Sequence, residues 1–170
     1  MLEHIITEVK KGTLNIEVAK RINLNPNEKI QIIVPFDELK EISLAGSGSL
    51  SSKNTLEAKK LSIKLSGSGK MNLALNVSKS VNVSKSGSGD VQLEGKAKSL
   101  TLKSSGSGKF ESKKLVVDKA DIKLSGSGKV YITCKDEISA KVSGSGKVYY
   151  KGSPSKIDTS TKGSGKIEQL

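Results

Sequence analysis

The chain has 170 residues, a formal net charge of +12 and 34% apolar residues, and only 3% of its residues are aromatic. This length suffices for one domain, and a core poor in aromatic side chains fits the stacked aliphatic layers of a repeat protein better than a compact globule. The single cysteine excludes an internal disulfide. No apolar run approaches the roughly 20 residues of a membrane-spanning helix. The first residues, MLEHIITEVKKG, lack the basic and apolar regions of a secretory signal, so we expect that any export signal was removed or never existed.

Three segments near the N-terminus alternate in the manner of β-strands: HIITEV (4–9), GTLNIEV (12–18) and KIQIIV (29–34). The residues at 10–12, Lys-Lys-Gly, predict a hairpin turn between the first two. These segments contain more apolar side chains than a solvated hairpin would hold, so we expect residues 1–39 to form strands that cap the repeat that follows. An edge left open at this end favours self-association, and we therefore also predict a weak homodimer through the N-terminal end.

A Gly-Ser-Gly motif recurs seven times after residue 40. The spacings between successive first glycines are 21, 20, 19, 20, 18 and 19 residues. A period near 20 residues indicates an array of structural repeats. The glycines of the seven motifs are Gly46, Gly48, Gly67, Gly69, Gly87, Gly89, Gly106, Gly108, Gly126, Gly128, Gly144, Gly146, Gly163 and Gly165.

The residues around each motif alternate between apolar and polar. Positions at an even distance from the first glycine are mostly apolar, such as Ile122 four residues before Gly126 and Val130 four residues after it. Positions at an odd distance are mostly polar, such as Lys123 and Lys129. A period of two is typical of strands with one buried face. Both glycines of a motif fall at inward positions and its serine at an outward one, so the pattern predicts a strand, a tight corner and a second strand.

The alternation continues without interruption through each motif, and this argues against other roles of a Gly-Ser-Gly sequence. A flexible linker would not stay in phase with the apolar positions on both sides, and a phosphate-binding loop would occur once, before a helix. We therefore predict an all-β fold, a β-solenoid with two strands per coil and the glycines at the corners. Residues 40–170 form seven coils stacked about 4.8 Å apart, and residues 1–170 form a single domain. The loop opposite each corner absorbs the variation in spacing.

Three of the expected inward positions carry polar residues. Lys85, Ser104 and Thr161 each stand two residues before a first glycine, where other coils have Leu65 and Leu124. We expect either that this position is shallow or that these coils bulge locally.

Four stretches carry a resemblance to a known family: VKKGTLNI (9–16), PFDELKEISLAGSG (35–48), the repeated LSGSG, and VYYKGSPSK…KGSGKIEQL (148–170). In these stretches the chain is similar to the putative auto-transporter adhesins with the head GIN domain, which are common in Bacteroidetes. The resemblance implies a right-handed parallel β-helix of pectin-lyase-like shape without catalytic residues, exported to the cell envelope or beyond it, with an adhesive role. Family members usually carry an export signal and further strands before the first of these stretches, so we expect an N-terminus from which these were trimmed.

The sequence offers little support for catalysis. The only histidine, His4, lies in the first expected strand, and the only cysteine, Cys134, falls at an inward position that favours a small buried side chain over a nucleophile. Asp121 and Asp158 share an outward column, but Ser139 stands between them. No group of His, Cys, Asp and Glu has the spacing of metal ligands. We therefore predict no catalytic residues, no metal site and no cofactor, and an enzyme of pectin-lyase-like shape is a distant third hypothesis.

Lysines form two outward columns, three residues before and three residues after the first glycines. Because both columns flank the same corner, we expect a basic stripe along one edge of the rod. The stripe serves either solubility or the binding of surface glycans or other polyanions. Nucleic acid fits less well, because Arg21 is the only arginine and aromatic residues are few. The lysines of the two columns are Lys64, Lys70, Lys103, Lys109, Lys123, Lys129, Lys141, Lys147 and Lys166.

The sequence therefore predicts a non-enzymatic adhesion-type or scaffold module of the cell envelope or the extracellular space. The alternative hypothesis is a polyanion- or carbohydrate-binding module that uses the lysine-rich edge. Salt-dependent binding to glycans separates the two, because only the second depends on exposed charge.

Overall fold

The computed structural model describes residues 4–19 and 30–170, and it divides the chain into two compact units, Met1–Phe36 and Asp37–Leu170. The described residues form β-strands joined by turns and loops, and none of their helices is long and apolar enough to cross a membrane. The predicted all-β fold is confirmed.

The first unit contains an antiparallel hairpin of β1 (Ile5–Lys10) and β2 (Thr13–Val18). Its turn places Lys11 at φ 48° and Gly12 at φ 76°. Two-residue hairpin loops of this kind need a positive φ at both central residues, because only then does the turn match the twist of the strands. The predicted hairpin and its turn are confirmed.

The third strand predicted in the first unit is wrong in its described part. Residues 30–34 form no β-ladder, and Lys29 lies outside the described residues. An alternating sequence becomes a strand only where a neighbouring strand offers hydrogen bonds to its backbone, and local alternation does not supply that neighbour. The expected cap of residues 1–39 and the homodimer through this end stay predictions.

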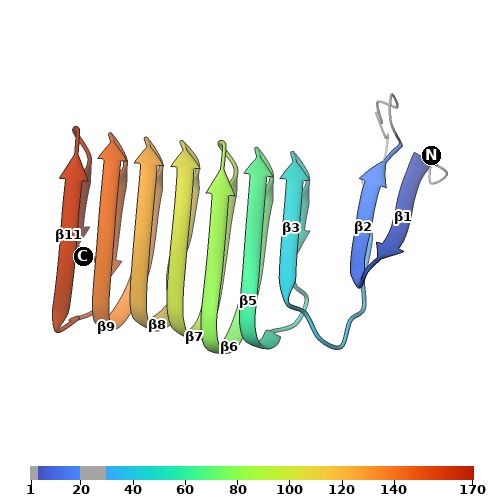
Figure 1. The fold of residues 1–170 in the computed structure, drawn as a ribbon, viewed down its shortest axis with the longest axis horizontal. Coiled ribbons are helices and arrows are strands. Elements are labelled where there is room, and N and C mark those ends of the chain that lie inside the picture. The colour runs from blue at the N-terminus through green and yellow to red at the C-terminus, as the bar shows by residue number, and fades with distance from the viewer. Residues whose placement is uncertain (1–3, 20–29) are drawn as a thin grey trace. The chain divides into compact units, whose positions relative to one another are not determined.

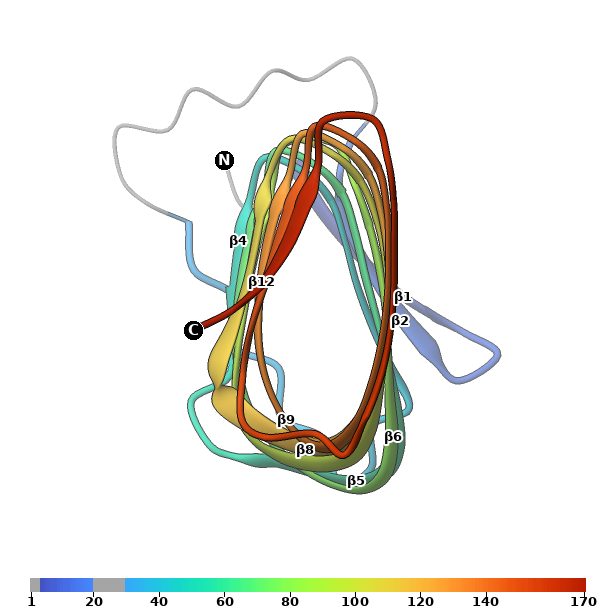
Figure 2. The same ribbon diagram turned by 90° about the vertical axis from the view of Figure 1, so that its left-hand side faces the viewer.

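The second unit is a parallel β-solenoid, in which a sheet wraps around a flattened coil (Figures 1 and 2). We call the side whose strands lead into the Gly-Ser-Gly corners the approach face, and the side whose strands leave them the departure face. The approach face contains β3 (Glu41–Gly46), β5 (Leu56–Gly67) and β11 (Lys156–Lys162), and the departure face contains β4 (Ser49–Ser51), β10 (Lys147–Lys151) and β12 (Lys166–Gln169). The strands that run along both faces are β6 (Lys70–Ser86), β7 (Asp90–Gly106), β8 (Lys109–Gly126) and β9 (Lys129–Gly144).

The core of the solenoid consists of straight columns of apolar side chains. Four residues before the corner, Leu102 and Ile122 are both 0% exposed, and four residues after it, Phe110 and Val130 are also 0% exposed. Each pair consists of register partners on adjacent coils, so like residues pack on like. The predicted division into inward even and outward odd positions is confirmed for these columns.

The structure places the Gly-Ser-Gly motifs at the bends between the two faces, and the register runs through the first glycine, as in the pairing of Gly106 with Gly126. Gly126 has φ +102°, a conformation that side chains other than glycine rarely adopt. A Cβ on Gly126 would lie 2.8 Å from the carbonyl oxygen of Gly106, and one on Gly128 would lie 2.8 Å from that of Gly108. These contacts show that the backbone of the preceding coil leaves no room for a side chain at the corner glycines.

The variation in coil length is taken up at the bend opposite the Gly-Ser-Gly corner. Register shifts occur there between Val77 and Ser80 and between Ser112 and Val116, while the pairing next to the corners is regular. Gly95 and Gly152 also have positive φ, of 108° and 113°, and they stand where a Cβ would meet the backbone of the preceding coil. The sequence analysis missed these two glycines, although both stand eight residues after a first glycine.

Two of the three polar residues in the inward column, Lys85 and Ser104, are buried without any local bulge. Lys85 pairs in register with Leu65 on one side and with Ser104 on the other. Lys85 is 2% exposed and Ser104 is 5% exposed, so both explanations expected from the sequence are wrong for these two residues. Thr161 differs, because it lies on the last approach strand and is exposed.

Candidate anion-binding surface

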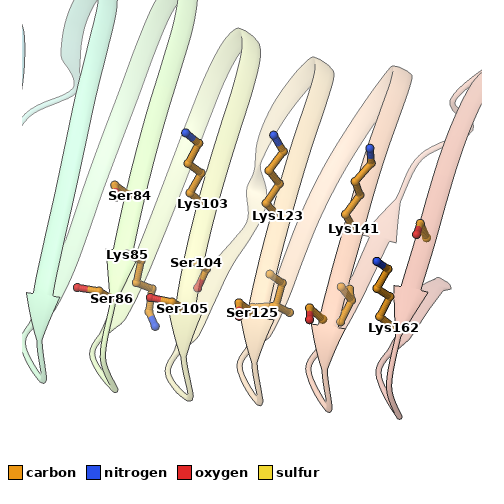
Figure 3. Close-up of a pocket in the computed structure, with 14 residues that line it drawn as sticks. Ser84, Lys85, Ser86, Lys103, Ser104, Ser105, Lys123, Ser125, Lys141 and Lys162 are labelled. Atoms are coloured by element: carbon orange, nitrogen blue, oxygen red, sulfur yellow. The ribbon is translucent and has the colours of Figure 1, made fainter.

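A shallow groove of about 480 Å³ runs across the approach face beside the corners (Figure 3). One wall carries Lys103, Lys123 and Lys141, which are register partners on β7, β8 and β9. They point outward because they stand at odd distances from the corner glycines. The other wall carries serines one residue before the corner: Ser86, Ser105, Ser125 and Ser143. Successive coils of a parallel sheet are about 4.8 Å apart, so each wall is a ladder with one side chain per coil.

The lysines of the groove have no acidic partner. Among the described residues, no carboxylate lies within 4.0 Å of the Nζ atoms of Lys103, Lys123 or Lys141. Lys64, in the same column, differs because its Nζ lies 2.9 Å from Glu41. Like charges one coil apart repel by up to about 1 kcal/mol per neighbouring pair in water. A bound anion would relieve this repulsion, so the groove is suited to negatively charged ligands.

The second predicted lysine column lies on the departure face, and the structure does not bring it into the groove. Its charges are partly compensated, since Lys109 Nζ lies 2.6 Å from Glu111 and Lys166 Nζ lies 4.0 Å from Glu168. A hydrogen bond to Glu111 raises the pKa of Lys109. Asp90 interrupts the column in the coil before Lys109 and accepts a hydrogen bond from its backbone N–H at 2.8 Å. The predicted stripe is therefore two columns on two faces, and their surroundings differ.

The departure face also carries a stack of two tyrosines that the sequence analysis did not single out. The rings of Tyr131 and Tyr149 lie 5.0 Å apart and nearly parallel, at 18°. Lys113 Nζ lies 4.3 Å from the centre of the Tyr131 ring, and Lys109 Nζ lies 4.9 Å from it. These lysines come from the coil before Tyr131 and Tyr149 from the coil after it, so both faces of that ring are occupied. Both tyrosines stand five residues after a first glycine, a shared offset that would have revealed the stack.

Within the solenoid, the residues weighed for catalysis do not form a site. Cys134 is 0% exposed, and its Sγ atom lies 3.1 Å from the carbonyl oxygen of Glu137 and 3.4 Å from that of Asp118, either of which can accept the hydrogen bond of the thiol. Burial raises the pKa of this thiol. Asp121 and Asp158 are each register partners of Ser139, as the sequence indicated. Within the described ranges, no group of three or more His, Cys, Asp or Glu side chains is placed to hold a metal ion, and Arg21 lies outside those ranges.

The coils, corners and outward ladders define this chain as a parallel β-solenoid repeat protein. The family described as "Putative auto-transporter adhesin, head GIN domain" matches residues 1–154, and the chain belongs to that family, as its resemblance implied. A solved structure titled a putative adhesin from Bacteroides fragilis is 31% identical, with a TM-score of 0.92 over 99% of this chain and 78% of that one.

Two less similar solved structures share the fold. A putative adhesin from Parabacteroides merdae is 18% identical, with a TM-score of 0.67 over 99% of this chain and 78% of its own. A putative lipid binding protein from Parabacteroides distasonis is 21% identical, with a TM-score of 0.62 over 99% of this chain and 80% of its own. No curated protein matches the sequence.

Proposed function

We propose that this chain is a non-enzymatic, adhesion-type module that is exported to the cell envelope or the extracellular space. The observation that carries the proposal is the parallel register from β5 to β9, which aligns equivalent positions of successive coils in columns. A surface that repeats about every 4.8 Å suits a ligand that also repeats, such as a polymer on a cell or matrix surface. The description of the family and the putative adhesin from Bacteroides fragilis support adhesion rather than catalysis.

Retention under flow tests the adhesion-type function. Beads coated with the chain are passed over surfaces coated with acidic polysaccharide, neutral dextran or serum albumin, and the retained beads are counted as the flow increases. A second set of beads carries a globular protein of similar net charge. The proposal expects the chain to hold beads on at least one polysaccharide surface at flow rates that remove the control beads. Equal loss of both kinds of bead from every surface would leave only a scaffold role.

A second candidate function, polyanion binding, is favoured by the unpaired lysines of the groove. Exposed charges are screened by salt, so this function predicts retention on immobilised heparin at low ionic strength and release as salt rises. Lys103, Lys123 and Lys141 changed together to Gln should elute at a lower salt concentration than the wild type. Equal elution of the two proteins would mean that these lysines serve solubility.

A further inference from the structure

The groove on the approach face differs from an ordinary charged surface. The lysines of one wall have no ion pair with a described residue, and the serine hydroxyls of the other wall have no hydrogen bond with one. Besides the three unpaired lysines, the hydroxyl groups of Ser86, Ser105, Ser125 and Ser143 form no hydrogen bond with any described residue. Figure 3 shows Lys103, Lys123 and Lys141 in one row, and Ser86, Ser105 and Ser125 together with Lys162 in a second row nearer the corners. The coils of Lys103, Lys123 and Lys141 therefore each offer a positive charge and a hydroxyl group at nearly the same height along the rod.

The lysine ladder has defined ends. In register with Lys103, the coil on the N-terminal side has Ser84, and in register with Lys141 the coil on the C-terminal side has Ser160. Lys64 lies one coil beyond Ser84, but Glu41 already neutralises it. The free charges of this column thus occupy three coils, and two coil spacings of about 4.8 Å separate the first from the last. Lys162, which has no ion pair with any described residue, adds a further positive charge to the groove from the next coil, in the column of the serines. A ligand that matches this ladder runs along the rod axis and carries its charges at intervals close to one coil spacing.

A linear acidic polysaccharide fits these requirements better than a nucleic acid. Its carboxylate or sulfate groups accept hydrogen bonds from ammonium groups, and its ring hydroxyls and oxygens pair with serine hydroxyls. Duplex DNA places a phosphate every 3.4 Å along each strand, more densely than one per coil. Proteins that bind single strands add aromatic rings on which bases stack. The groove has no aromatic lining residue, and on the departure face both faces of the Tyr131 ring are covered.

We propose that the groove between Lys103, Lys123 and Lys141 and the facing serines binds a linear acidic polysaccharide laid along the rod axis, with one anionic group per coil. This assignment rests on the proposed function as a binding module, and it adds the face, the direction and the class of ligand. The departure-face lysines take part only as diffuse charge.

The test compares two triple variants that lose the same charge. One changes Lys103, Lys123 and Lys141 to Gln, and the control changes Lys109, Lys129 and Lys147 to Gln. Binding of oligogalacturonates of two to eight units and of size-fractionated heparin oligosaccharides is measured by calorimetry, and thermal melts verify that both variants fold. We expect the approach-face variant to lose at least about tenfold in affinity and the control less than about threefold, since exposed ion pairs contribute little singly but add up along a ladder.

Two further readouts follow from the ladder. Affinity should rise with oligomer length up to about four units and then level off, because the free lysines of the groove, Lys162 included, span four coils. Ser105, Ser125 and Ser143 changed together to Ala should weaken binding about two- to fivefold without changing its dependence on salt, because no charge is removed.

The possible failures are distinguishable. Equal losses in the two lysine variants would overturn the groove assignment and keep polyanion binding as a diffuse property of the surface. Tighter binding of a thymidine oligonucleotide than of any acidic oligosaccharide would overturn the ligand class. If the wild type binds no acidic polymer even at low salt, both the groove assignment and the polyanion candidate fail, whereas adhesion to a neutral glycan in the flow assay would survive.

Discussion

Lys85 and Ser104 are register partners on adjacent coils, and both side chains are buried in an inward column between Leu65 and Leu124. The Nζ atom of Lys85 lies 3.5 Å from the carbonyl oxygen of Gly87, a long contact for an ammonium donor. Burial lowers the pKa of Lys85, and the carboxylate of Asp90 partly opposes this effect. The buried amine of Lys85 therefore lowers the free energy of unfolding.

Replacing this amine should stabilise the protein. We expect Lys85→Leu to raise the free energy of unfolding by about 1–3 kcal/mol, because a buried polar group with poor hydrogen bonding is exchanged for the residue that the column otherwise uses. Denaturant unfolding at pH 7 measures the change. Lys129→Leu is the control, since that lysine is exposed. A lower stability for Lys85→Leu than for the control would mean that the amine has a favourable partner.

The same lysine predicts a dependence on pH. Its pKa is lower in the folded state than in the unfolded state, so the unfolded state binds more protons between the two values. Lys85 therefore costs stability at neutral pH, and this cost fades as the pH rises toward the unfolded value of about 10.4. The stability advantage of Lys85→Leu over the wild type should shrink from pH 7 to pH 10. An advantage that stays constant would place the effect in packing alone.

The Gly-Ser-Gly corners predict a large loss of stability when a glycine is replaced and a small loss when the serine is replaced. Gly126→Val should destabilise by at least about 2 kcal/mol, because the residue has φ +102° and its Cβ would lie 2.8 Å from the carbonyl oxygen of Gly106. Ser127→Ala should stay within about 0.5 kcal/mol, because its side chain is exposed. Thermal melts measure the stability of the two variants. A larger loss of stability for the serine variant would mean that the serine, and not the glycine, points into the solenoid.

A charge ladder near the opposite bend predicts sensitivity to acid. Glu137 accepts hydrogen bonds from Lys156 at 2.6 Å and from Lys119 at 3.0 Å, and these two bonds lower its pKa. A carboxylate with a lowered folded pKa stabilises the protein above its unfolded pKa, and this contribution is lost as the pH falls through the folded value. Glu137→Gln should therefore be less stable than the wild type at pH 7, and the difference should shrink as the pH falls below the unfolded value of about 4.3.

The control for this pH effect is Glu94→Gln, since Glu94 has no ion pair with any described residue. Its melting temperature should follow that of the wild type over the whole pH range. A Glu137→Gln difference that persists unchanged at pH 3 would show that side-chain packing, and not charge, causes it.

The buried thiol gives the fourth prediction. Cys134 is 0% exposed and burial raises its pKa, so the native protein should hold little accessible thiolate at pH 8. A disulfide reagent such as Ellman's should label the native chain at least about a hundredfold more slowly than the chain in guanidinium chloride. Labelling at similar rates in both conditions would show that the coils near β9 open readily. An exposed model thiol, such as glutathione, calibrates the reagent under each condition.

The sequence by itself determined the coil, its corners and its core. The alternation around Gly126 has a period of two, and that local pattern states which side chains point inward, whichever coil lies next. The repeat spacing then places Ile122 against Leu102, because both stand four residues before a corner. The hairpin turn was equally readable, since Lys-Lys-Gly between two alternating segments supplies the positive φ that the turn needs.

The tertiary structure alone decided what depends on neighbouring coils. The flattened coil puts Lys109 and Lys123 on different faces, and only the wrapping of the sheet separates them. Lys85 is buried because its strand keeps a regular register with both neighbouring strands. The hydrogen bonds along the whole strand outweigh the free-energy cost of burying one amine. Lys113 meets the Tyr131 ring although the two residues stand seven and five residues after their corner glycines, so a shared offset does not reveal this contact. Contacts between coils join residues far apart in the chain, so their physics enters only when the coils stack.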